Sequence, residues 1–312
     1  MLLGRLLAIV PVLLGVTFVV FVAMHLAPGD VARTILGFGA TEERVEALRA
    51  ELGLDRPILV QYAHWLWNLL HGDLGQSIAL GVPVSDVILD KVGASLLLMA
   101  SSFVGAAGGG LLLAALSGGA HRSMRDRGIT IVTLVCASLP PFWIGIVLLY
   151  AFSYQLGLFP STGMVSMVDP GGWLDVAHHL VLPTITTALS SMAVVARVTR
   201  GSFIDIMNSP YIFAARAHGT PRRRLVRVDA MRNVLPVFVT ISGLQIGYLF
   251  GSVIFSEIIF NWPGIGLQLY QAIIYRDYPV VQGCVLAVAI VFVFGNLLAD
   301  LIVHALDPRK RA

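Results

Sequence analysis

The chain has 312 residues, of which 57% are hydrophobic and 12% are charged, with a formal net charge of +3. A soluble globular domain carries about twice that share of charged residues, so the composition excludes an ordinary soluble protein and favours a membrane protein. Its two cysteines, Cys136 and Cys284, lie in apolar stretches, which excludes a disulfide framework and offers no metal-ligand spacing.

Six stretches lack Asp, Glu, Lys, Arg and His over close to the length of a membrane-spanning helix, about 20 residues. They are residues 6–24, 92–120, 128–168, 180–196, 233–256 and 278–299. Backbone groups in lipid must bond within their own segment, which predicts helices. A membrane β-barrel would show short alternating segments instead. The sequence therefore predicts an all-α integral membrane protein with six transmembrane helices.

The first apolar stretch, which follows Arg5, has the charge pattern of a signal peptide. However, Leu26-Ala27-Pro28-Gly29-Asp30 lacks a small-x-small cleavage site. We therefore expect residues 1–27 to be a retained N-terminal transmembrane helix.

Residues 28–92 are predicted to form a small helical segment outside the membrane. Thr41 is placed to cap a helix that ends at Gly53, and a second helix is expected from Pro57 to Gly72. Trp65 and Trp67 suit the membrane interface. We favour a small cap packed on the bundle over a ligand-binding domain.

Pro140-Pro141 falls inside the third apolar stretch and should break or kink its helix. Broken helices in transporters often line a cavity, so Phe142 and Trp143 are candidates to close a path. A permanent structural bend explains the prolines equally well.

The fifth stretch carries Gly243, Gly247 and Gly251 at four-residue intervals. Such a ridge favours close packing within the bundle over a face toward a partner or a path. The polar candidates for a path or gate on this helix are Gln245, Ser252 and Glu257.

A short segment with clear signals for the start and the end of a helix lies between the fourth and fifth stretches. It belongs to a predicted cytoplasmic loop at residues 200–234. Ser209 suits an N-cap, Pro210 the first helical position and Gly219 a left-handed helix end. So short a helix needs a partner surface, and its alanines allow close approach. The candidate docking residues are Ser209, Pro210, Tyr211, Phe213, Ala214, Ala215, Ala217 and Gly219.

Fifteen of the 21 lysines and arginines fall on the side of the membrane that holds both termini. Positive charge marks the cytoplasmic side, so both termini are expected there, and residues 28–92 outside. For Arg222, Arg223, Arg224 and Arg227, anchoring at anionic lipid is the favoured role.

The cytoplasmic segment resembles the inner-membrane permeases of ABC importers, whose signature is Glu-Ala-Ala, three residues, Gly, a spacer and Leu-Pro. Five residues match it, namely Ala214, Ala215, Gly219, Leu235 and Pro236, whereas Phe213 replaces the acid. This departure bears on docking, and Asp205, the Ser209 cap or a second permease could supply the missing group.

Further blocks resemble the dipeptide and oligopeptide branch of these permeases in the family's own order. They are residues 26–30, 53–57, 72–75, 138–143, 261–266, 276–283 and 307–309. Nickel, glutathione and some sugar systems resemble the same branch, so the solute stays open.

The resemblance implies a type I ABC importer permease fold, with a core at residues 93–305 and a cytoplasmic tail at 306–312. It also implies a second permease, two ATP-binding subunits and an extracytoplasmic solute-binding protein in a bacterial inner membrane. ATP and magnesium would be held by the ATPases. Lys91 and Lys310 are the only lysines, and neither lies in the Gly-Lys-Ser/Thr of a phosphate-binding loop.

Two rival functions are weaker. An intramembrane enzyme should show His-Glu-x-x-His or Gly-x-Ser-x-Gly, and neither occurs. A secondary transporter has no need of the capped cytoplasmic helix. We expect a non-catalytic subunit without resident metal or cofactor, in contact with lipid and not with nucleic acid.

Overall fold

The computed structural model describes residues 2–26, 31–36, 39–51, 53–119, 123–166 and 171–306, which are mainly helical. The helices are α1 (Leu2–Leu26), α2 (Val31–Leu36), α3 (Glu42–Glu51), α4 (Ile58–Leu70), α5 (Val84–Gly118), α6 (Met124–Ser138), α7 (Pro141–Leu148), η1 (Leu149–Gln155), α8 (Trp173–Met207), α9 (Pro210–Ala217), α10 (Arg222–Arg224), η2 (Leu225–Ala230), α11 (Met231–Ile259), α12 (Ile265–Ile274) and α13 (Tyr278–Leu306). Within these ranges the β structure is one isolated bridge, between Gln76 and Pro83.

Among the described residues, five helices are long and apolar enough to cross a membrane, or six if a broken pair counts as one span. The pair is α6 with α7–η1, and its two arms are bent by 108°. The break lies at Leu139-Pro140, which confirms that the two prolines interrupt the third predicted span.

Several spans extend beyond the apolar stretches that predicted them. Helix α8 runs from Trp173 to Met207. Another continuous helix runs from Arg222 to Ile259, so it begins well before Leu235-Pro236, where the fifth span was expected to open. A helix keeps its backbone bonds where it leaves the membrane, so charge-free length underestimates helix length. Two of the family blocks fall wholly or largely outside the described residues, at residues 27–30 and 307–309.

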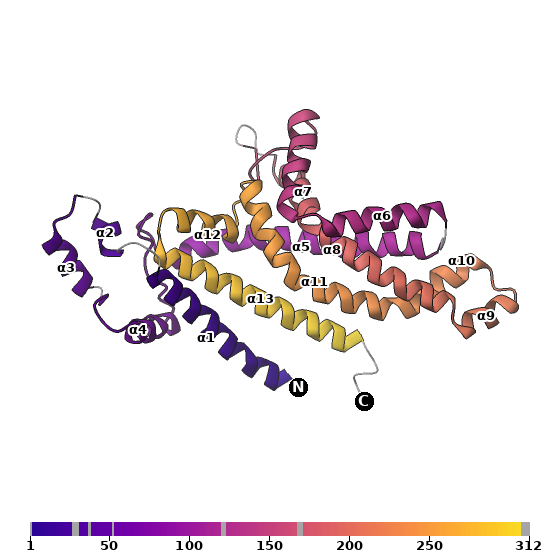
Figure 1. Cartoon of the computed structure of the whole chain (residues 1–312), viewed down its shortest axis with the longest axis horizontal. Helices are drawn as coiled ribbons and strands as arrows, with labels where there is room; N and C mark the ends of the chain where they lie inside the picture. The colour runs from indigo at the N-terminus through magenta and orange to yellow at the C-terminus, as the bar shows by residue number, and fades with distance from the viewer. Residues whose placement is uncertain are drawn as a thin grey trace. The chain divides into compact units, whose positions relative to one another are not determined.

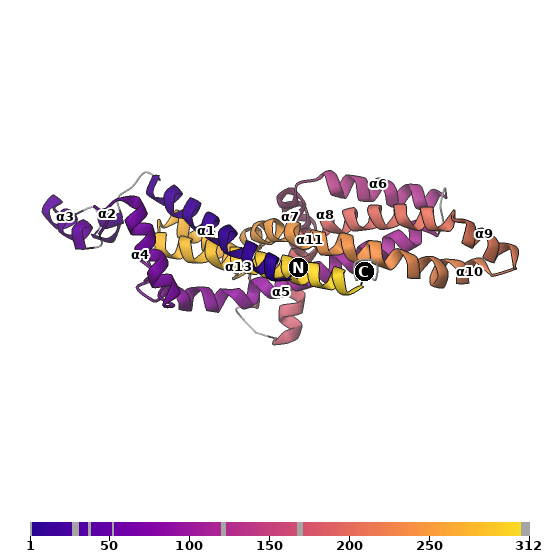
Figure 2. The same ribbon diagram turned by 90° about the horizontal axis from the view of Figure 1, so that it is seen from below.

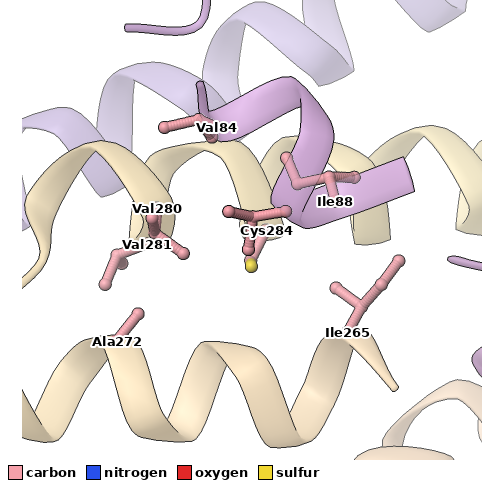
Figure 3. Close-up of a cluster of buried hydrophobic side chains, with 8 residues drawn as sticks. Val84, Ile88, Ile265, Ala272, Val280, Val281 and Cys284 are labelled. Atoms are coloured by element: carbon pink, nitrogen blue, oxygen red, sulfur yellow. The ribbon is translucent and has the colours of Figure 1, made fainter. Parts of the chain in front are cut away.

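The chain divides into two compact units, Met1–Gly93 with Gly264–Val293, and Ala94–Pro263 with Phe294–Ala312. In the first unit, apolar side chains from α5, α12 and α13 form a core (Figure 3). Its buried members are Val84, Val87, Ile88, Ile265, Ala272, Val280, Val281 and Cys284. Helix α12 was not predicted, because ten residues fall below the length of a span.

The first unit also contains α3 and α4, near their expected positions. Gly53 and Gly72 follow these helices with φ angles of +65° and +82°, and Pro57 is the N-cap of α4. Helix α4 packs on α1 through aromatic rings, with Tyr62 centroids 5.2 Å from Phe18 and 5.5 Å from Phe21. The segment that was predicted to lie outside the membrane therefore includes a helix that packs against the first span.

In the second unit, α8 lies beside α6 and α11 (Figures 1 and 2). Helix α5 approaches α8 through small residues, since a Cβ added at Gly105 would lie 3.6 Å from that of Ala188. At Gly109 an added Cβ would lie 2.5 Å from the Met192 sulfur. Glycines therefore set the spacing of these two helices, as small residues do in membrane proteins.

One glycine in the first unit gives a test of this close packing. A Cβ at Gly283 would lie 2.5 Å from Val84 Cγ1 and 2.7 Å from Ile88 Cδ1. We expect Gly283→Ala to reduce the stability of the purified protein by about 1–3 kcal/mol, the usual cost of overpacking. The matched control is Gly93→Ala, where nothing lies within 4 Å. Equal thermal-unfolding midpoints for the two variants would contradict the packing.

Candidate functional site

Helix α9, between α8 and the helix that contains α11, has the predicted ends. Pro210 occupies its first turn, and Gly219 follows it with a φ of +79°. The Thr220 amide donates to the Ala215 carbonyl at 3.1 Å, and the Gly219 amide to that of Arg216 at 3.0 Å. These two bonds form a Schellman motif, which explains the glycine.

Ser209 is the N-cap of α9 by position, but its side chain does not cap the helix. Its hydroxyl donates instead to the Ile206 carbonyl, at 2.5 Å, in the last turn of α8. The Ser209 hydroxyl therefore ties α9 to α8. The expectation that the Ser209 side chain caps α9 was therefore wrong.

The two sides of α9 have different surroundings. Ile212 is buried and Ala215 half-buried, while α9 packs against η2. Phe213, Ala214 and Ala217 are exposed. Successive helical residues are about 100° apart, so these three share one outward face. A partner would touch this face, whereas Ala215 belongs to the inner side.

The exposed Phe213, at the position of the signature acid, has a basic neighbour. The Arg216 guanidinium lies 5.6 Å from the centroid of its ring, within cation–π range. Tyr211, also exposed, accepts a hydrogen bond from the Asn233 amide nitrogen at 3.0 Å. The outward face therefore combines two alanines with an aromatic ring and a positive charge.

The helices on either side of α9 are packed together in one core. It is formed by Phe203 of α8, Ala230 of η2 and Val234 of α11. A Cβ at Gly118 of α5 would lie 2.8 Å from that of Phe203, so α5 also closes on this core. A displacement of α9 would therefore pass directly to three long helices of the second unit.

A buried polar cluster reinforces the same end of this unit. Arg200 of α8 donates to both carboxylate oxygens of Asp126 at 2.7 and 2.9 Å, and to the Ser117 hydroxyl at 2.8 Å. Ser117 in turn donates to Asp126. Asp126 is buried and Arg200 is half-buried, and this bidentate pair joins α5, α6 and α8.

We expect Asp126→Asn to destabilise the protein by about 3 kcal/mol, because it leaves a partly buried guanidinium without its counter-charge. The control Asp205→Asn removes an exposed carboxylate from the same end of α8. Replacing both members, as Asp126→Leu with Arg200→Leu, should recover much of the loss. The thermal-unfolding midpoint of each of these three variants is measured in detergent. An unchanged midpoint for Asp126→Asn would contradict a stabilising role for the Asp126–Arg200 pair.

The candidate path residues fall into two groups in the isolated chain. Phe142 and Trp143 are exposed beside the break, whereas Gln245 and Glu257 are buried within the second unit. The Ser95 hydroxyl donates to Glu257 at 2.6 Å, and Ser252 is half-buried. Glu257 therefore lies in the interior of the second unit.

The glycines on α11 also differ from one another. Gly243 is buried, but Gly251 is exposed with nothing within 4 Å of an added Cβ. The exposed strip of α11 continues through Leu244, Tyr248 and Phe255. The predicted packing ridge therefore holds for one end of the helix only.

Two family descriptions cover almost all of the sequence. Residues 110–312 match the binding-protein-dependent transport system inner membrane component, and residues 1–98 match the N-terminal part of such membrane components. The chain belongs to this family. It is thus a permease subunit with several membrane-spanning helices, and the predicted resemblance is confirmed.

Full-length relatives of this binding-protein-dependent permease are found in several bacteria. A permease protein assigned to a peptide transport system of Brucella abortus is 39% identical over 312 residues, covering 100% of this chain and 98% of the relative. The dipeptide transport system permease DppB of Escherichia coli is 36% identical and covers 99% of this chain and 98% of DppB. The oligopeptide transport system permease AppB of Bacillus subtilis is 36% identical, with 98% and 97% covered.

Among solved structures, the permease resembles a chain of the inward-facing MetNI methionine ABC transporter. The TM-score is 0.57 at 18% identity, over 71% of this chain and 96% of that chain. Identity at this level supports the fold alone. The expected type I ABC importer permease fold is confirmed.

Proposed function

We propose that this permease is one of two membrane subunits of an ATP-driven importer of dipeptides or oligopeptides. A second permease would complete the path, two ATP-binding subunits would hold ATP and magnesium, and an extracytoplasmic protein would deliver the solute. The full-length relatives support the peptide assignment, since they belong to peptide, dipeptide and oligopeptide transport systems. This chain itself would catalyse no reaction.

The observation that carries the proposal is α9. It is a firmly ended helix, packed on its inner side and exposed along Phe213, Ala214 and Ala217. An alanine-rich outer face allows another protein to approach its backbone closely. ATP-driven closure of the ATPases would then move α9 and, through the core around Phe203, rock the long helices.

The position of the arginines supports a cytoplasmic location for α9 and for both termini. Arg222, Arg223 and Arg224 are exposed in the first turn after α9. Cytoplasmic segments of membrane proteins are enriched in such residues. The segment that contains α3 and α4 would then lie outside the cell.

The test is reconstitution of the complete complex in proteoliposomes with its binding protein. We expect uptake of a labelled dipeptide that requires both the binding protein and ATP on the side of the ATPases. Uptake of nickel or glutathione in preference to peptide would overturn the substrate. Uptake driven by an ion gradient without ATPases would overturn the importer class.

A further inference from the structure

The apolar surface of α4 is wider than its contact with α1 requires. Tyr62 and Trp65 face α1, with the Trp65 ring 6.2 Å from that of Phe21. Beyond this contact Leu59, Ala63 and Leu70 form a second, exposed apolar face, and Trp67 lies at its edge. The exposed fractions of Leu59, Trp67 and Leu70 are 63–74%. The polar side chains form a separate stripe on the remaining side, made of Gln61, His64, Asn68 and His71.

Three hydrogen-bond contacts give the orientation of α4 along the first span. His25 Nε2 lies 2.9 Å from the Gln61 side-chain oxygen, near the end of α1. The Tyr62 hydroxyl donates to the Leu14 carbonyl at 3.2 Å and lies 2.9 Å from Thr17 Oγ1. At 1.5 Å per residue, Leu14 and His25 are roughly 16 Å apart along α1. Gln61 is therefore at the rim of the span, and Tyr62 reaches toward its middle.

This orientation also places the second apolar face. On a helix with about 100° between residues, Leu59, Ala63 and Leu70 follow Tyr62 on the side away from Gln61. They therefore point toward the level of the middle of α1, while the polar stripe points toward the end of α1 that contains His25. Helix α1 is itself apolar and exposed at Val10, Val12 and Val19, so the span on which α4 packs also presents an apolar surface suited to lipid.

We propose that α4 is an interfacial helix that inserts its Leu59–Ala63–Leu70 face into the lipid leaflet at the end of α1 that contains His25. Amphipathic helices bind a membrane surface in this way, with aromatic residues at the headgroup boundary. Trp67, between the apolar face and the polar stripe, occupies that boundary. The choice of the outer leaflet rests on the proposed topology, but the insertion itself does not.

Insertion would give α4 a mechanical role in the first unit. On one side α4 is bonded to α1, and on the other it leads into residues 77–79, which Asp277 holds at the start of α13. A lipid-held α4 would thus link the rims of the first and last spans. The height of the whole extracytoplasmic segment relative to the bilayer would follow from it.

The test uses nitroxide labels on the complete chain within its assembled complex. Cys136 and Cys284 are replaced by alanine, and single cysteines are placed at residues 59, 63 and 70, or at the control residues 64, 68 and 71. The samples are embedded in nanodiscs of phosphatidylethanolamine and phosphatidylglycerol. Collision with oxygen, which enters lipid, is compared with collision with a water-soluble nickel chelate.

We expect oxygen collisions to dominate at 59, 63 and 70, and nickel collisions at 64, 68 and 71. Nickel dominance at both sets would mean a water-exposed face, and weak collision with both reagents at 59, 63 and 70 would mean a protein partner. Either result overturns the proposal. Peptide uptake and ATPase binding, measured on the same samples, separate this failure from failure of the proposed function.

A second measurement avoids labels that could disturb the fold. Trp67→Phe conserves the aromatic ring but removes one indole from the quenching of tryptophan fluorescence by brominated lipids. Lipids brominated near the headgroup should quench the wild-type chain more than this variant. Equal quenching of the two by bromines at every depth would overturn the assignment of Trp67 to the boundary.

Discussion

Ala217→Asp is expected to abolish solute uptake while the subunit still inserts into the membrane. Ala217 is exposed on the outward face of α9, beside Ala214 and Phe213. A carboxylate there must lose its water if an ATPase groove covers the helix, and burying a charge costs several kcal/mol unless a well-placed partner compensates it. Each 1.4 kcal/mol weakens association tenfold, so the ATPases should bind more than tenfold less tightly.

The measurements are ATP-dependent uptake in proteoliposomes and co-purification of the ATPases with the tagged permease. Asn208→Asp is the matched control, because it adds the same charge at an exposed position just before α9. The control should keep both ATP-dependent uptake and co-purification with the ATPases. Normal uptake with Ala217→Asp at normal membrane levels would contradict a docking role for this face.

The choice of Ala217 depends on a feature that the sequence could not provide. The motif favours Ala214, Ala215 and Ala217 equally, because all three are small. Ala215 lies on the inner side with Ile212, against η2, so a charge there would disturb the seat of α9 as well as any docking. Which side faces outward is decided by a tertiary neighbour and not by the helix itself.

Local signals were sufficient for several parts of the fold. Pro210 and Gly219 predicted the ends of α9, and Pro140-Pro141 the break between α6 and α7. These effects arise from a missing amide, a fixed φ or freedom to adopt a positive φ, all within a few residues. The spans followed from hydrophobic length for a similar reason, since lipid acts on each segment separately.

Interactions between distant residues were missed. Arg200 counted as one of many cytoplasmic arginines, yet it forms a bidentate pair with Asp126, 74 positions away. Residues 72–75 and 276–283 were known only as separate family blocks. The structure brings them together, with Gly75 packed near Pro279 and Asp277 bonded to residues 77–79. Nothing in the spacing along the chain indicates such pairings.

Asp277→Ala is expected to have the largest effect on stability. The Asp277 carboxylate is buried and caps α13 through the Val280 amide at 3.4 Å. It also accepts hydrogen bonds from the Ser77 hydroxyl and from the amides of Ile78 and Ala79, at 3.2 and 3.1 Å. Leaving such buried donors without an acceptor costs about 1–3 kcal/mol each, so we expect a loss of about 4 kcal/mol after partial relaxation.

Two further variants separate the roles of this carboxylate. Asp277→Ser keeps an N-cap oxygen for α13 but is too short to reach residues 77–79, so it should restore only the helix cap. Asp55→Ala removes an exposed carboxylate and should leave the thermal midpoint unchanged. Limited proteolysis should cut residues 72–83 faster in both Asp277 variants than in the wild type. The result that would contradict this is an Asp277→Ala variant with the same thermal midpoint and the same rate of cleavage as Asp55→Ala. Residues 72–83 would then be held by their own turns, and the link between residue 77 and residue 277 would contribute nothing measurable to stability.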